Sequence, residues 1–145
     1  MNLAATIVLL WAVPLTSHSG ATRPTRIVGP SFAGAIVSAE EQLNSDPRHV
    51  LKLAEVWTPT EADVLEAEKL LPPYLDSLDA TSVRASRIRA QLPRYKRQYW
   101  GVIRRGRREI LIHFYHEDTP VGRNRLWLQS ILAVLGGGDQ FLRVS

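Results

Sequence analysis

The clearest pattern in the sequence is an alternation of apolar and polar residues with a period of two, which begins at Tyr95. This period is typical of β-strands and predicts strands over residues 95–104 and 107–116. Gly106 is the only residue in "IRRGRR" that readily adopts a positive φ. We therefore expect an antiparallel hairpin whose turn is built around this glycine.

The register of this hairpin depends on the length of its loop. A two-residue loop would consist of Arg105 and Gly106, and a three-residue loop would consist of residues 104–106. Only the longer loop gathers the apolar side chains of both strands on one face, namely Trp100, Val102, Ile110, Ile112 and Phe114. Because a slip of one residue moves a strand's apolar set to the other face, we expect the three-residue loop.

The opposite face of the hairpin is then rich in tyrosine, with one arginine and one histidine. Its residues are Tyr95, Arg97, Tyr99, His113 and Tyr115. Tyrosine and arginine dominate binding hot spots, so this face is the candidate binding surface. The charge of Arg97 should keep His113 neutral there. The alternatives are a half-polar sheet surface, or a face that residues 22–49 fold over.

A helix is predicted by "TPTEADVLEAEKLLPP", in which apolar residues follow a period of 3.6. Thr58 suits the N-cap, Pro59 the first helical position, and Glu61 completes a capping box. The helix should end at Leu71, because the two prolines that follow cannot donate a backbone N–H.

A second helix is predicted by "ATSVRASRIRAQLP", which Pro93 should end. Its inward residues would be Val83, Ile88 and Leu92, and its outward residues Arg84, Arg87 and Arg89.

The remaining segments carry weaker patterns. Residues 50–57 suit a helix or a strand, and we favour a strand that ends at Trp57. Residues 126–135 and 140–145 predict a further hairpin around "GGGD". Residues 22–49 mix Pro, Gly and Ser without sustained periodicity and are predicted to be a linker, with a possible helical turn near 38–41. Together the elements predict an α+β fold, with a helix packed on an antiparallel sheet of hairpins.

The order of "EVWTPTEADVLEAEKLLP", "RQYWGVIRRGRREILIHF" and "LGGGDQFLRVS" resembles a group of small exported bacterial proteins of unassigned function. The resemblance spans residues 55–145 and rests on structural rather than catalytic motifs. It implies further chain beyond Ser145 and brings no known activity. The predicted arrangement is also similar to cystatin-like folds, although a fold does not fix a function.

The N-terminal segment predicts export. Residues 3–15 form an apolar run with the length of a signal-peptide core, too short to span a bilayer. Small residues lead to a cleavage site after Ala21, although no Lys or Arg precedes the apolar run. The alternative is a buried N-terminal helix of the domain. We expect a signal peptide over 1–21, a linker over 22–49 and one domain over 50–145, which is periplasmic or secreted and has no transmembrane span after cleavage.

The amino-acid composition excludes some kinds of reactive site and favours some kinds of partner. The chain has no cysteine, which excludes disulfides, thiol nucleophiles and thiolate metal sites. Its net charge is +4, which favours anionic partners or reflects the base composition of the genome. For an exported protein, envelope polymers and lipid headgroups are more accessible than nucleic acid, which we do not expect as a partner. The exposed arginines of the predicted turn would carry this anion binding: Arg104, Arg105, Arg107 and Arg108.

No residue pattern predicts a catalytic or metal site. His113 and His116 are three residues apart, so on one strand they point to opposite faces. No serine lies in a recognisable nucleophile elbow. We therefore expect no catalytic residues, cofactor or metal, and a non-catalytic domain that binds or inhibits another envelope or extracellular protein. The alternatives are an anion binder that uses the arginine turn and a hydrolase of unknown type.

Overall fold

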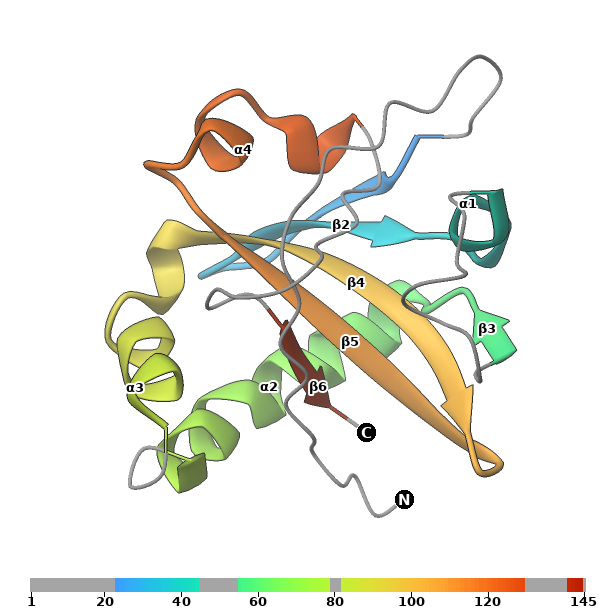
Figure 1. The fold of residues 1–145 in the computed structure, drawn as a ribbon, viewed down its shortest axis with the longest axis horizontal. Coiled ribbons are helices and arrows are strands. Elements are labelled where there is room, and N and C mark those ends of the chain that lie inside the picture. Colours follow the sequence, from blue (N-terminus) through green and yellow to red (C-terminus); the bar gives the residue numbers. More distant parts are fainter. Residues whose placement is uncertain (1–22, 45–54, 79–81, 130–140, 145) are drawn as a thin grey trace.

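The structure, a computed structural model, describes residues 23–44, 55–78, 82–129 and 141–144. Its strands are β1 (Thr25–Val28), β2 (Ala33–Val37), β3 (Glu55–Trp57), β4 (Tyr95–Arg104), β5 (Arg107–His116) and β6 (Phe141–Val144). Its helices are α1 (Ala39–Asn44), α2 (Glu61–Leu78), α3 (Val83–Ala90) and α4 (Pro120–Arg123), with 3₁₀ turns η1 (Leu92–Arg94) and η2 (Leu126–Leu128). Figure 1 shows α2 lying across one face of the sheet, with α4 near the end of β5.

The sheet is centred on the β4–β5 hairpin and has the order β1-β2-β4-β5-β6. One edge of β4 is shared by two strands: β2 pairs with Lys96–Trp100 in parallel, and β3 pairs with Gly101–Ile103 in antiparallel. The α+β fold is thus confirmed. The sheet is mixed rather than wholly antiparallel, because β2 runs parallel to β4. The similarity to cystatin-like folds stays a prediction.

The linker prediction for residues 22–49 is wrong for residues 25–37, which contain β1 and β2, whereas the helical turn expected near 38–41 is present as α1. Ile27, Ile36 and Val37 are buried in the sheet's two cores. The sequence pattern hid these strands because each is short, and because residues of β2 are buried on both faces and do not alternate with polar ones. Residues 45–49 and the predicted signal peptide, 1–21, lie outside the described residues.

The predicted cap and end of the first helix are also wrong. Thr60, not Thr58, caps α2: its hydroxyl accepts from the Asp63 N–H at 3.2 Å, and the Asp63 carboxylate accepts from the Thr60 N–H at 2.8 Å. This is a reciprocal capping box placed two residues later than expected. The Thr58 hydroxyl instead accepts from the Ala39 N–H at 2.9 Å, which ties β3 to α1.

Helix α2 continues through Pro72 and Pro73 to Leu78. A proline inside a helix costs about 3 kcal/mol. Leu71 and Leu75, on either side of the pair, are completely buried, and each gains roughly 1.5–3 kcal/mol from that burial. The burial of these leucines therefore opposes the tendency of the two prolines to end the helix.

Helix α3 ends before Pro93, as predicted, and Ile88 is buried in the core. Leu92 is partly buried against the same core, also as predicted. Val83, however, is 76% exposed rather than inward. At about 100° per residue, positions 83 and 88 are roughly 140° apart around the helix, so they cannot share its buried face. Ala85 takes the inward position instead.

The β4–β5 hairpin has the two-residue loop, so the predicted three-residue register is wrong. Trp100 lies opposite Leu111, and Arg104 lies opposite Arg107. Arg105 and Gly106 both have positive φ, 49° and 74°, as a type I′ turn requires. The three-residue loop was predicted on the assumption that only one face of the hairpin is buried. Both faces are buried, so the apolar residues of either register lie in a core.

The two cores explain how each face is covered. Toward α2 the hairpin contributes Tyr95, Tyr99, Ile110, Ile112 and Phe114. On the other face Trp100, Val102 and Leu111 pack with Val37 of β2.

The remaining strands, β3 and the C-terminal ones, were predicted in part. The strand ending at Trp57 is confirmed as β3, with residues 50–54 outside the described part. Residues 126–128 form a 3₁₀ turn, so the predicted strand is wrong there, and 130–135 are not described. Strand β6 exists as predicted, but its partner among the described residues is β5 and not the predicted strand at residues 126–135.

Candidate functional site

The predicted tyrosine face does not form one exposed surface. The two-residue loop places Tyr95, Arg97 and Tyr99 on the side of α2 and puts His113 and Tyr115 on the opposite side. All five residues are buried. The prediction that they share a binding face is wrong, because it depended on the three-residue loop and on one face of the hairpin being open.

Arg97 is the centre of a buried polar group beneath α2. Its Nε lies 3.0 Å from Glu68 Oε1, and the Tyr99 hydroxyl donates to the same oxygen at 2.7 Å. Arg97 also donates to the carbonyl oxygens of Tyr95 and Leu92, at 2.9 and 3.2 Å. Burial raises the pKa of Glu68, and the Arg97 charge and the Tyr99 hydrogen bond oppose this rise only in part. The group joins α2 to β4 and leaves no open surface for a ligand.

His113 belongs to a separate buried group on the other face. Its ring stacks on Trp100 with centroids 4.5 Å apart, and the Tyr115 hydroxyl lies 3.5 Å from its Nδ1. Gln98 joins this layer to η2 by donating to the Trp127 carbonyl oxygen at 2.8 Å. Burial lowers the pKa of His113 well below its usual value, so the ring is neutral as predicted. The reason is burial rather than the charge of Arg97, which lies on the opposite side of the sheet.

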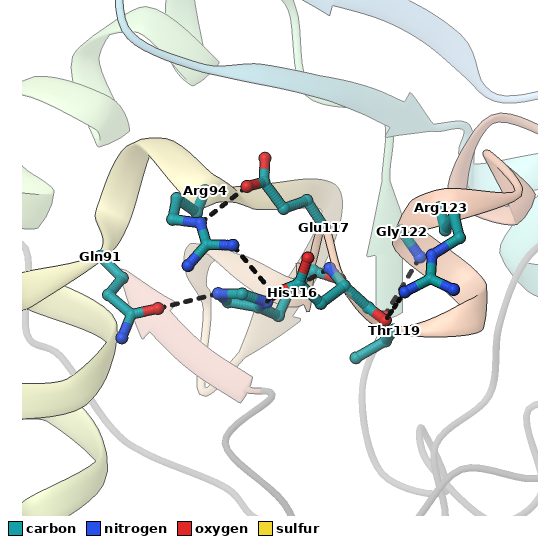
Figure 2. Close-up of polar contacts among 8 residues, drawn as sticks. Gln91, Arg94, His116, Glu117, Thr119, Gly122 and Arg123 are labelled. Carbon is teal, nitrogen blue, oxygen red and sulfur yellow. Dashed lines mark hydrogen bonds and ion pairs between the residues drawn. The ribbon is translucent and has the colours of Figure 1, made fainter.

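A surface polar cluster lies where η1 meets the end of β5 (Figure 2). His116 Nε2 lies 2.8 Å from Gln91 Oε1, and His116 Nδ1 accepts from the Asp118 N–H at 3.3 Å. The Asp118 carboxylate lies 3.6 Å from the same Nδ1. Both ring nitrogens thus have polar partners within the cluster.

The carboxylates of this cluster are engaged as well. Arg94 pairs with Glu117 at 2.6 Å (Figure 2) and with Asp118 at 2.8 Å, and the side chains of both pairs are exposed. The Thr119 hydroxyl donates to the His116 carbonyl oxygen and accepts from the Gly122 N–H as the cap of α4. The geometry is that of a joint between η1, β5 and α4 rather than of a nucleophile with its base.

Metal binding has no support from the part of the chain that is described. His113 and His116 point to opposite faces of β5, as predicted. Across the described ranges, no three His, Cys, Asp or Glu side chains gather in a way that could hold a metal ion.

The tip of the β4–β5 hairpin is a cluster of arginines on a projecting element. Among the described residues, β3 pairs with β4 as far toward the tip as Ile103, and β6 pairs with β5 as far as Ile110. The hairpin therefore extends past the described ends of both neighbours (Figure 1). Among the described residues no carboxylate pairs with any guanidinium of Arg104, Arg105, Arg107 or Arg108.

The tip arginines are divided between the two faces of the hairpin. Arg104 and Arg107 are direct cross-strand partners and share one face. Arg108 lies opposite Ile103 and shares the other face with Trp57 of β3, whose ring centre is 4.8 Å from the Arg108 guanidinium carbon. The sequence identified these arginines but not the contribution of Trp57, because the β3–β4 pairing is not visible in the sequence pattern.

No family model, curated protein or solved structure matches the chain. None of the described helices is both long enough and apolar enough to cross a bilayer. Since the comparisons indicate no function, the proposal below is based on the arginine tip of the described structure.

Proposed function

We propose that the protein is a non-catalytic binding domain that engages phosphate-bearing polyanions, on envelope polymers or lipid headgroups, through its arginine tip. The observation that carries the proposal is the direct cross-strand pair of Arg104 and Arg107, with Arg105 in the turn between them and no carboxylate partner among the described residues.

This arrangement is unfavourable for the isolated fold. Like charges directly opposite each other destabilise a hairpin, and cross-strand pairs contribute roughly 0.2–1 kcal/mol each. A bound anion between Arg104 and Arg107 would offset that repulsion. Arginine suits this role because its planar guanidinium donates two parallel hydrogen bonds to one phosphate or carboxylate.

The scaffold beneath the tip is rigid. Trp100 and Val102 of β4 and Leu111 of β5 are buried in one core, and Ile110 and Ile112 in the other. The two strands are therefore held on both faces up to the point where they project. A rigid element loses little conformational entropy on binding, so the tip is well suited to present its charges to an extended anionic surface.

Export is a second part of the proposal. The apolar run at residues 3–15 and the small residues before Thr22 support it, and an envelope location makes anionic polymers and lipid headgroups available as ligands. Mass spectrometry of the native protein should find Thr22, or a residue within a few positions of it, at the N-terminus. A soluble cytosolic protein that retains Met1 would overturn this part.

The binding proposal is tested by co-sedimentation with vesicles of phosphatidylglycerol and phosphatidylcholine, and by retention on immobilised polyphosphate. The variant is Arg104→Gln with Arg107→Gln. Each arginine near an anionic surface contributes about 1 kcal/mol, so the double variant should bind roughly 30-fold more weakly. Binding of the wild type should also fall steeply with added salt.

The control carries the same loss of charge elsewhere. Arg87 and Arg89 are exposed on α3, which lies at the other end of the molecule from the hairpin tip (Figure 1). The variant Arg87→Gln with Arg89→Gln should bind vesicles nearly as well as the wild type. Equal losses in the two double variants would show that only net charge matters, and undiminished binding by the tip variant would exclude the tip as the site.

A further inference from the structure

Trp57 is held flat against β4 at a position where the strand has no side chain. A Cβ built on Gly101 would lie 2.8 Å from Cδ2 and Cε2 of the indole, so only glycine leaves the space that the ring occupies. The indole Nε1 donates to the Val102 carbonyl oxygen at 3.1 Å, which fixes the orientation of the ring. One face of Trp57 is thus packed against the strand.

Arg108 stacks on this fixed ring. Its guanidinium carbon is 4.8 Å from the ring centre, within the range of a cation–π contact. Arg108 is exposed, and within the described ranges it has no carboxylate partner. Stacking uses the flat face of a guanidinium and leaves the N–H groups at its edge available as donors.

The stack therefore distinguishes Arg108 from the other arginines of the tip. An exposed arginine side chain carries about 2 kcal/mol of rotamer entropy, part of which it loses when it binds. Contact with Trp57 restricts Arg108 before any ligand arrives, so that less entropy remains to be lost. No ring contact of this kind holds Arg104, Arg105 or Arg107 within the described part of the chain.

We propose that Arg108, oriented by Trp57, is the specific contact of the arginine tip and donates two parallel hydrogen bonds to oxygens of one phosphate group. The inference rests on the proposed function and names the group that the tip recognises. The arginines at 104, 105 and 107 supply charge without fixed geometry. Phosphate suits this contact because two of its oxygens can accept the parallel hydrogen bonds of one guanidinium.

The test uses substitutions that conserve charge. Lysine retains the positive charge of arginine but cannot donate the paired, coplanar hydrogen bonds. Arg108→Lys should bind phosphatidylglycerol vesicles about tenfold more weakly, which corresponds to the loss of one such contact. Arg87→Lys on α3 is the matched control outside the tip, and its affinity should stay within about twofold of the wild type, since surface attraction follows charge.

A second readout identifies the source of the phosphate. The indole N–H signal of Trp57 in a ¹⁵N-labelled sample should move when inorganic phosphate is added, if the contact recognises phosphate itself. A signal that moves only with phosphatidylglycerol vesicles would assign the contact to the lipid surface. Both results support the inference, and in both the response should be lost in Arg108→Lys.

The outcomes separate the two proposals. Equal affinities for Arg108→Lys and Arg87→Lys, with an indole signal that no probe moves, would overturn the role of the Trp57–Arg108 stack while leaving a charge-driven tip intact. If the Arg104→Gln, Arg107→Gln variant binds with wild-type affinity while Arg108→Lys shows the expected loss, the cross-strand pair is not a binding site and Arg108 is.

Discussion

Replacing Glu68 with glutamine should destabilise the protein strongly, because it leaves Arg97 as a buried charge without a counter-ion. The Arg97 side chain is 1% exposed and that of Glu68 is 10% exposed. A guanidinium cannot become neutral by losing its proton. Breaking a buried ion pair by removing one partner costs about 3–5 kcal/mol, and we expect Glu68→Gln to fall in that range.

The remaining contacts of Arg97 set a limit on this loss. Its guanidinium still donates to two backbone carbonyl oxygens and lies 5.7 and 5.8 Å from the ring centres of Phe32 and Phe114. Glutamine also preserves an acceptor for the Tyr99 hydroxyl. We therefore expect a folded variant with a lower free energy of unfolding rather than an unfolded chain.

A double variant distinguishes the charge from the packing. Glu68→Leu with Arg97→Met removes both charges and retains most of the volume. Replacing both partners of a buried pair by apolar residues is often close to neutral, so this double variant should be more stable than Glu68→Gln. Urea unfolding, followed by tryptophan fluorescence, provides the free energies for a complete double-mutant cycle.

Desolvation opposes the loss expected for Glu68→Gln, because burial raises the pKa of Glu68 above its ordinary value of 4.5 and so disfavours the carboxylate that pairs with Arg97. A loss below about 1 kcal/mol, well under the range for a broken buried pair, would refute the description of Arg97 as a charge that depends on Glu68.

Two further predictions concern the other face of the sheet. Trp100→Ala should cost about 3–5 kcal/mol in urea unfolding, since the side chain is buried against Val37 and Leu111, and a loss under about 1 kcal/mol would contradict that packing. Burial lowers the pKa of His113 well below 6.5, so its contribution to stability should be lost as the pH falls below 6.5. His113→Phe should reduce that fall in acid unfolding curves, and an unchanged curve would mean that His113 is not a buried neutral group.

The elements with local signals could be predicted from the sequence. The strands of the hairpin, the existence of α2, the end of α3 before Pro93 and the end of β3 at Trp57 all follow from periodicity or from proline. The arginines of the tip were also identified, because a charged turn is visible in any register. What these features share is that neighbouring residues in the chain determine them.

The features that were missed depend on contacts between distant segments. The continuation of α2 past Pro73 depends on the burial of Leu75, and β2 depends on its parallel pairing with β4. The register of the hairpin could not be predicted because the sequence does not show that both of its faces are covered. Residues of η2 and β2 cover the face opposite α2. The Trp57–Arg108 stack requires both the β3–β4 pairing and the space at Gly101.

The turn residue Arg105 connects the stability of the fold to the proposed function. Arginine there adopts a left-handed conformation with φ of 49°, which costs most residues about 1–2 kcal/mol and which asparagine tolerates better. Arg105→Asn should therefore stabilise the protein by roughly 0.5–1 kcal/mol, a typical gain for an improved turn. It should also weaken vesicle binding by about fivefold, because one cation near the surface is lost. Urea unfolding and co-sedimentation of the same sample test both effects. A variant that is more stable and binds equally well would show that Arg105 takes no part in anion binding, whereas a less stable variant would contradict the type I′ turn. The expected pair of results would mean that the hairpin gives up stability at its turn in order to place a third guanidinium between Arg104 and Arg107.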